Sequence, residues 1–222
     1  MQKRKDLYIE VHKGLRKGLM NIMTGAGRLD VENDELLAAF IDDLNNFIDL
    51  LAGHAGHEDK WIGPHLITID KELADTIEAE HVEDKKLTQS LKNEYKKLLQ
   101  LDREQRSAAG DKAYILLADF VGWYFRHMSK EEQVIMSKLQ AKLSDKELME
   151  IEHQLVGGIP PNEMNKYMEL IIPSTNPEEL RVLFGGMKHH APPEAFEGAC
   201  SLAETLLPPD DWHSLKDFLA SA

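Results

Sequence analysis

The sequence is poor in cysteine and has no long apolar run. Cys200 is the single cysteine among 222 residues, so an intramolecular disulfide is excluded and a reducing compartment is favoured. Any metal site must then use nitrogen and oxygen ligands, which excludes zinc fingers and iron–sulfur clusters. No apolar stretch approaches the roughly 20 residues of a spanning helix, and residues 1–6 do not resemble the start of a signal peptide. We therefore expect a cytoplasmic protein without a membrane partner.

Positive charge is also scarce. A formal net charge of -13 would repel a phosphate backbone, so we expect no nucleic-acid partner. Lysines do cluster over residues 85–97, but acidic residues are interleaved with them, which is typical of a solvated helix face. The chain also lacks a Gly-x-Ser-x-Gly elbow, a His-Glu-x2-His zinc motif and a phosphate loop. A hydrolase of these classes is therefore disfavoured.

The chain does contain long stretches in which apolar residues recur every three or four positions. These predict amphipathic helices over about residues 3–23, 33–61, 70–110 and 111–143, with Asn33 or Asp34 and Asp70 as caps. No stretch alternates with the period of a strand. We therefore predict an all-α fold, in which residues 1–148 form an antiparallel up-and-down four-helix bundle.

The remaining residues, 149–222, differ from the bundle in sequence, because they are rich in proline and contain only short helical stretches. A capping box at Ser144 and Glu147, just before this region, opens a fifth helix that runs into it and ends at Gly157, and prolines then mark the starts of a series of short helices. We expect these helices to pack on the bundle. They could also form the output surface of a sensor, or contact a protein partner or a second copy of the chain.

Histidines and glutamates occur at spacings that suit a metal site inside the bundle. Residues four apart on a helix are only about 40° apart around its axis, so a His-x3-Glu pair points both groups one way. The second and fourth predicted helices each carry such a pair, and the first and third each add one histidine. Burying six such groups without a metal would be costly. The six candidate ligands are His12, His54, Glu58, His81, His127 and Glu131.

Not every His-x3-Glu pair in the sequence is expected to bind a metal. His190 and Glu194 have the same spacing, but Pro192 and Pro193 lie between them, so we interpret this pair as accidental. Imidazole and carboxylate ligands suit iron or manganese, and they also accept zinc.

The stretches at residues 54–64 and 127–136 resemble the two His-x3-Glu-acidic signatures of hemerythrin-like (HHE cation-binding) domains. Residues 80–81 and 11–16 are similar to the signatures of the third and first helices of that family. The resemblance covers roughly residues 5–143. It implies a di-iron centre, with Fe2+ or Fe3+ ions joined by an oxo or hydroxo bridge. Glu58 and Glu131 would bridge the ions, and the four histidines would be terminal ligands.

The resemblance also implies a function, for which two classes remain possible. The family binds O2 reversibly, or senses iron, O2 or related small ligands such as NO and peroxide. The alternative is a di-iron oxidoreductase that turns over peroxide or NO on the same site.

The sequence departs from the oxygen carriers of this family on the third helix. Those carriers have His-x3-His there, but Ile77 stands four residues before His81. An open coordination position favours reactivity with peroxide or NO over reversible O2 storage. Glu131 is preferred to its neighbour as a ligand, because the neighbour lies about 140° from His127 around the helix axis. Candidates for an additional ligand, or for a residue that supports the ligands, are Tyr8, His57, Glu80, Tyr124 and Glu132.

A ferritin-type di-iron bundle is the closest rival. Its pattern is Glu-x2-His on two helices, with a glutamate on each of the others. Glu78 and His81 fit one half of that pattern. The other half fails, because Tyr124 stands three residues before His127 and Glu150–His153 lies past the bundle.

Overall fold

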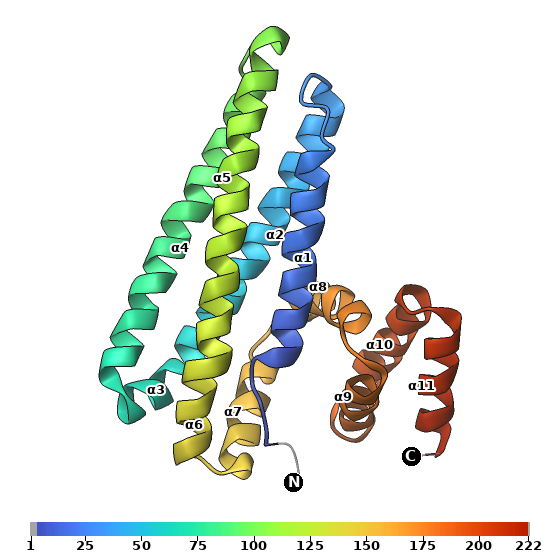
Figure 1. Cartoon of the computed structure of the whole chain (residues 1–222). Coiled ribbons are helices and arrows are strands. Elements are labelled where there is room, and N and C mark those ends of the chain that lie inside the picture. Colours follow the sequence, from blue (N-terminus) through green and yellow to red (C-terminus); the bar gives the residue numbers. More distant parts are fainter. Residues whose placement is uncertain (1–3, 222) are drawn as a thin grey trace. The chain divides into compact units, whose positions relative to one another are not determined.

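The computed structural model describes residues 4–221, and within this range all regular structure is helical. The prediction of an all-α fold is therefore confirmed. The part of the chain that is described holds no helix with the length and apolar character needed to cross a bilayer. The elements, labelled in Figure 1, are α1 (Ile9–Gly27), α2 (Asp34–Trp61), α3 (Gly63–Ile69), α4 (Lys71–Leu98), α5 (Arg103–Lys130), the π-helix η1 (Glu131–Ile135), α6 (Met136–Lys142), α7 (Asp145–Gly157), α8 (Pro161–Ile171), the 3-10 turn η2 (Ile172–Ser174), α9 (Pro177–His190), α10 (Pro193–Leu206) and α11 (Pro209–Ser221).

The chain divides into two compact units. Among the described residues, the first unit comprises those up to Ile9 together with Gly18–Ile159. The second comprises Glu10–Lys17 and the residues from Pro160 onward. Helix α1 is continuous and contributes residues to both units.

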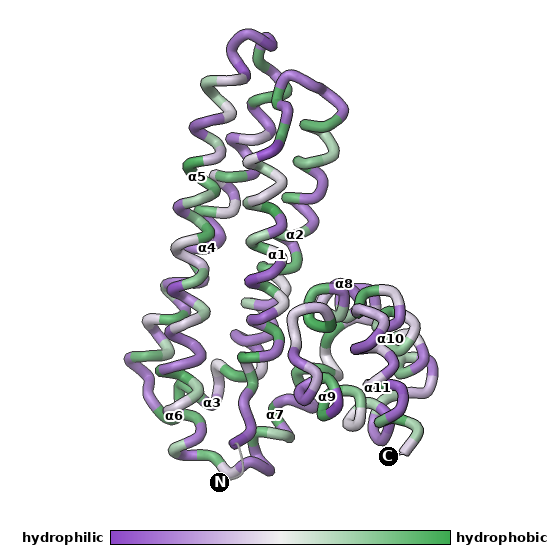
Figure 2. The backbone as a smooth tube through the Cα atoms, turned by 45° about the vertical axis from the view of Figure 1, so that its right-hand side comes forward, coloured by the Kyte–Doolittle hydropathy of each residue, from purple (hydrophilic) through white to green (hydrophobic). Residues whose placement is uncertain are grey.

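The first unit is a bundle of long helices. Helices α1, α2, α4 and α5 run side by side in Figures 1 and 2, and α4 packs against both α2 and α5. Hydrophilic and hydrophobic segments alternate along these helices in Figure 2, as a helical apolar stripe requires. The helix α1 approaches α2 closely at Gly18, where an added Cβ would lie 2.2 Å from the ring of Phe47.

Several helix ends follow the predicted signals. The side chain of Asn33 accepts hydrogen bonds from the first backbone N–H groups of α2, and Asp70 does the same for α4. Ser144 and Glu147 form the predicted capping box of α7. The predicted start of the first helix, Lys3, lies outside the described residues, and α1 begins at Ile9.

The predicted junction between the third and fourth long helices was wrong. The helix α4 ends at Leu98 and α5 begins at Arg103, several residues before the predicted start at Asp111. No glycine or proline marks this turn. It is held instead by the buried Arg106, which donates hydrogen bonds to the carbonyl oxygen of Leu101 and to the carboxylate of Asp34. A tertiary contact of this kind leaves no local sequence signal.

The helical stretch predicted to end at about Leu143 does continue to Lys142, but the sequence did not predict a π-helical turn within it. The π-helical turn η1 separates α5 from α6. A π-turn bonds each N–H to the carbonyl five residues back and is found mostly as a short bulge, often at a functional site. The short helix α3, which starts with Pro64 in its first turn, was not predicted either.

The second unit has its own small apolar core. Its central side chains are Ile172, Leu180, Phe184, Ala203 and Leu215. Proline stands in the first turn of α8, α9 and α10, and α11 also begins with proline, as the sequence predicted for this region. The α1 residues of this unit pack closely, since an added Cβ at Gly14 would meet Ile171 at 3.0 Å.

Candidate metal centre

All six predicted ligands are buried, each with at most 7% of its surface exposed. They come from α1, α2, α4, α5 and the first residue of η1. Polar and ionisable groups are rarely buried unless they are paired, because leaving water costs several kcal/mol per ion. A cluster of four imidazoles and two carboxylates in the interior therefore requires a compensating interaction. The six residues are His12, His54, Glu58, His81, His127 and Glu131.

These side chains converge in two groups that share two members. One group consists of His12 and His54 with the two glutamates, and the other of His81 and His127 with the same two glutamates. Within each group the candidate ligand atoms all lie within 4.8 Å of one another. Glu58 and Glu131 therefore belong to both groups, each of which could hold a metal ion.

The nearest contacts in the cluster are consistent with helical spacing. His54 Nε2 lies 3.1 Å from Glu58 Oε1, and His127 Nε2 lies 3.0 Å from Glu131 Oε1. Each pair is four residues apart, so each histidine and its glutamate share one face.

His81 provides a test of whether the cluster fits a metal. Its Nε2 lies 3.7 Å from Glu58 Oε2 and 3.8 Å from Glu131 Oε1, which is too far for a hydrogen bond. This nitrogen is buried and has no hydrogen-bond partner among the described residues. An imidazole nitrogen held at this distance from two carboxylates fits a shared cation between them, so the residues present fit a metal site.

The π-turn bears on which acidic residue of the fourth helix reaches the cluster. Glu131 is the first residue of η1 and is 1% exposed. Glu132 is half-buried and belongs to neither group. The preference for Glu131 over Glu132, based on the angle around the helix, therefore agrees with the geometry.

Two carboxylates contact the Nδ1 atoms of two histidines in the cluster and so orient their rings. Asp59 accepts a hydrogen bond from His81 Nδ1 at 2.6 Å, and Glu80 lies 2.8 Å from His127 Nδ1. Glu80 also pairs with Lys130. A carboxylate at Nδ1 fixes the tautomer and leaves Nε2 facing the site, which is the usual support of a metal-binding histidine. Glu80 was among the candidate residues, whereas no role was predicted for Asp59.

These partners also change the acid–base behaviour of the histidines. Burial alone would lower the pKa of His81, but the hydrogen bond to Asp59 and the carboxylates of Glu131 and Glu58 outweigh it and raise the pKa to about 10. The pKa of His127 is raised as well, since Glu131 and Glu80 outweigh burial. Because these folded-state values exceed the unfolded value of 6.5, the protonated histidines stabilise the metal-free protein fully below about pH 6.5. For His81 this contribution is lost as the pH rises through about 10.

Metal binding should therefore release protons well above neutral pH. We expect Zn2+, a redox-inert probe, to displace at least one proton per chain at pH 8, because His81, with a pKa of about 10, holds a proton in the metal-free protein. Asp59→Asn should release fewer protons and bind about 10–100-fold more weakly. Calorimetry in two buffers of different ionisation enthalpy measures the release. The control is Asp49→Asn. Asp49 lies on α2, as Asp59 does, and forms an exposed ion pair with Lys92 of α4. Equal proton release from all three proteins would contradict this assignment.

Asp84 is a buried acidic residue that the sequence interpretation missed. It lies three residues after His81 and is 4% exposed. Its Oδ1 has no hydrogen-bond partner within residues 4–221. Burial raises the pKa of Asp84 to about 6, although the nearby charges of His127 and His81 oppose this. Helical spacing could have identified it, because residues three apart share a face.

The other predicted candidates surround the cluster at different depths. Tyr8 is buried, and burial together with the charges of Glu58 and Glu131 holds the pKa of its hydroxyl well above the usual value. Tyr124 packs edge-on against His127, with ring centroids 5.8 Å apart. His57 is half-buried and belongs to neither group.

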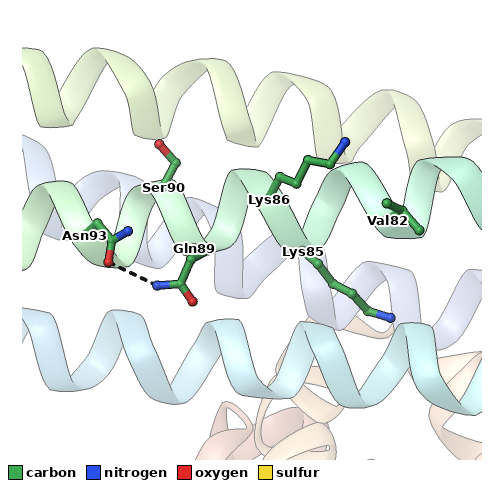
Figure 3. A pocket seen from close by; sticks show the side chains of 6 residues that line it. All are labelled: Val82, Lys85, Lys86, Gln89, Ser90 and Asn93. Carbon is green, nitrogen blue, oxygen red and sulfur yellow. Dashed lines mark hydrogen bonds between the residues drawn. The ribbon is translucent and has the colours of Figure 1, made fainter.

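A pocket of about 290 Å³ reaches this cluster from one side. Tyr8, Glu58, His81 and Glu131 are among its lining residues, and so is Ile77, which stands where the oxygen carriers have a further histidine. A second hollow lies on the exposed face of α4, around Lys85, Lys86 and the hydrogen-bonded pair of Gln89 and Asn93 (Figure 3). That hollow is shallow and contains none of the buried residues of the cluster.

The pair formed by His190 and Glu194 is not part of any such arrangement. His190 is the last residue of α9, and α10 begins at Pro193, so the two residues do not share a helix. The break in the helix at this point, predicted from the two prolines, is therefore confirmed.

Comparison with protein families supports the interpretation of the cluster. The model of the hemerythrin HHE cation-binding domain matches residues 6–139. This stretch contains all six buried histidines and glutamates. No curated protein and no solved structure matches the chain.

Proposed function

The chain belongs to the hemerythrin HHE cation-binding domain family, and on this premise we propose that it holds two iron ions and uses them to bind or sense O2 or a related small ligand. The observation that carries this proposal is the sharing of Glu58 and Glu131 by both groups of candidate ligands. Two carboxylates common to two pairs of histidines are what a bridged pair of metals needs.

The proposal gives each residue of the cluster a role. Glu58 and Glu131 would each contribute to holding both ions. His12 and His54 would hold one of them, and His81 and His127 would hold the other. Iron is favoured over zinc because mixed imidazole and carboxylate ligands with open positions are typical of non-haem iron sites. Bound iron would supply redox chemistry toward small oxidants.

The protein's own residues prepare the site for a ligand. Asp59 and Glu80 hold two of the histidines in place, so the ligand set needs little rearrangement. Each group has only two histidines and two shared carboxylates, which leaves coordination positions for water or a small ligand. The pocket that contains Ile77 and Tyr8 gives such a ligand a route to the cluster.

Ligand-binding and turnover measurements on the iron-loaded protein test this proposal. We expect reversible O2-dependent changes in the visible spectrum, which disappear when O2 is removed. Protein in which Glu131 is replaced by alanine should show none. Iron-loaded protein with no spectral response to O2, NO or peroxide would contradict a ligand-binding role.

The alternative is an oxidoreductase that consumes peroxide or NO on the same site. The specific observation in its favour is Ile77. Because its side chain is apolar and cannot bind a metal, one coordination site stays open to reactive ligands. Steady consumption of peroxide or NO over many cycles would favour the enzyme. Reversible binding without consumption would favour the binding or sensing role.

A further inference from the structure

The pocket beside the cluster has an unusual distribution of charge. Five of its lining residues are acidic, and no lysine or arginine lines it. Two of them, Glu58 and Glu131, lie at its buried end. The other three, Asp59, Asp75 and Glu78, are exposed to solvent. Carboxylates therefore extend from the protein surface to the candidate ligands.

Apolar side chains form the remaining wall of this pocket. Ile62, Leu66, Ile77 and Ile135 are buried lining residues, and together with Tyr8 they belong to one apolar cluster. Walls of low polarity strengthen the field of the carboxylates along the pocket, because water screens it less there.

The buried end of the pocket offers an acceptor for a cation. His81 is 2% exposed and lines the pocket, and its Nε2 has no hydrogen-bond partner among the described residues. After losing its proton, an imidazole nitrogen that has no hydrogen bond and lies 3.7 and 3.8 Å from two carboxylates is placed to bind a divalent cation together with them. The acidic surface residues and this nitrogen are independent features that point to the same class of ligand.

We propose that this pocket is the passage to the cluster, and that its exposed carboxylates admit divalent cations and small uncharged ligands while they exclude anions. The proposal rests on the proposed metal-binding function and specifies which ligands reach that site. Once the ions are bound, Glu58 and Glu131 are neutralised, but Asp75 and Glu78 still face solvent and keep the mouth negative. Asp75 pairs with Lys71, so its charge is partly offset.

The test is the rate at which Fe2+ binds to the metal-free full-length protein under anaerobic conditions. In the double variant Asp75→Asn/Glu78→Gln, neither substituted residue belongs to a group of candidate ligands, so the final metal content should be unchanged. We expect its association rate at low ionic strength to fall by about tenfold, because two negative charges are removed from the path of a doubly charged ion. At about 1 M salt, where the Debye length is only about 3 Å, the difference should disappear.

The matched control is Glu83→Gln/Asp119→Asn. Both residues are exposed, lie on α4 and α5 outside the pocket, and give the same change in net charge. The control should bind Fe2+ at the wild-type rate. If Fe2+ binding slows equally in both double variants, the effect comes from net charge alone, and the proposal that this pocket is the passage is wrong.

A second measurement addresses the exclusion of anions from the iron-loaded protein. Azide is the anionic probe and NO the uncharged probe. The pocket variant should bind azide faster than wild type by a similar factor, with NO binding unchanged. Azide rates that are the same in all three proteins would contradict the exclusion.

The outcomes also separate this inference from the proposed function. If none of the three proteins takes up metal, the metal-binding function itself is wrong. If all three take up two ions at equal rates, the function stands and only the passage is wrong.

Discussion

Glu58→Ala is expected to release both metal ions, and Glu131→Ala should do the same. Each glutamate belongs to both groups of candidate ligands, so removing either one breaks both sites at once. Supporting residues around metal sites are typically worth about 10–100-fold in affinity, so the loss of a bridging ligand should exceed about 100-fold at each ion. Metal analysis after dialysis measures this directly.

Two neighbouring residues serve as controls. Glu132→Ala removes the same chemical group one position along the chain, and His57→Ala removes an imidazole one position before Glu58. Neither residue belongs to either group, so both variants should keep their metal. By contrast, His54→Ala and His81→Ala should each lower the binding affinity for one ion more than for the other. A Glu58→Ala protein that keeps both ions would refute the bridging role.

Removing the metal should lower the thermal stability of the protein by about 10 °C or more. Without metal, the contacts among the four buried imidazoles and two buried carboxylates offset only part of their desolvation, and a bound cation adds to that compensation. A ligand present at 1,000 times its Kd stabilises the folded state by about 4 kcal/mol. For a chain of this length each kcal/mol corresponds to roughly 2–4 °C in Tm.

Thermal unfolding with and without a chelator tests this expectation. The midpoint should fall on addition of chelator and recover when iron is restored. In Glu58→Ala, which should already lack metal, the chelator should have no effect. An unchanged midpoint in the wild-type protein would show that the buried cluster is stable without a cation.

The candidate ligands named from the sequence lie close together in the structure because they follow helical spacing. One His-x3-Glu pair lies on α2 and the other spans the end of α5 and the start of η1, and in both pairs the helical period brings the two side chains to the interior. The caps at Asn33 and Asp70 were predictable for the same local reason, since a side-chain oxygen satisfies the first N–H groups of a helix.

The features that were missed depend on contacts between distant segments. The turn between α4 and α5 is fixed by Arg106 reaching Asp34, which is remote in sequence. The partner of His81 is Asp59 on a different helix. No local pattern distinguishes these carboxylates from the many solvated acidic residues of a chain with this net charge.

The π-turn was missed for a related reason. Residues 131–135 continue the sequence pattern of an α-helix, and no glycine or proline interrupts them. The wider turn buries both Glu131 and Ile135. Packing around the cluster therefore decides this geometry, and helix propensity does not.

The most direct measurement of the central claim is the iron content of the full-length chain purified after expression with iron. Two shared glutamates between two pairs of buried histidines predict two iron ions per chain, both lost in Glu58→Ala. A chain that binds no metal, or a single ion that persists in Glu58→Ala, would contradict the bridged pair.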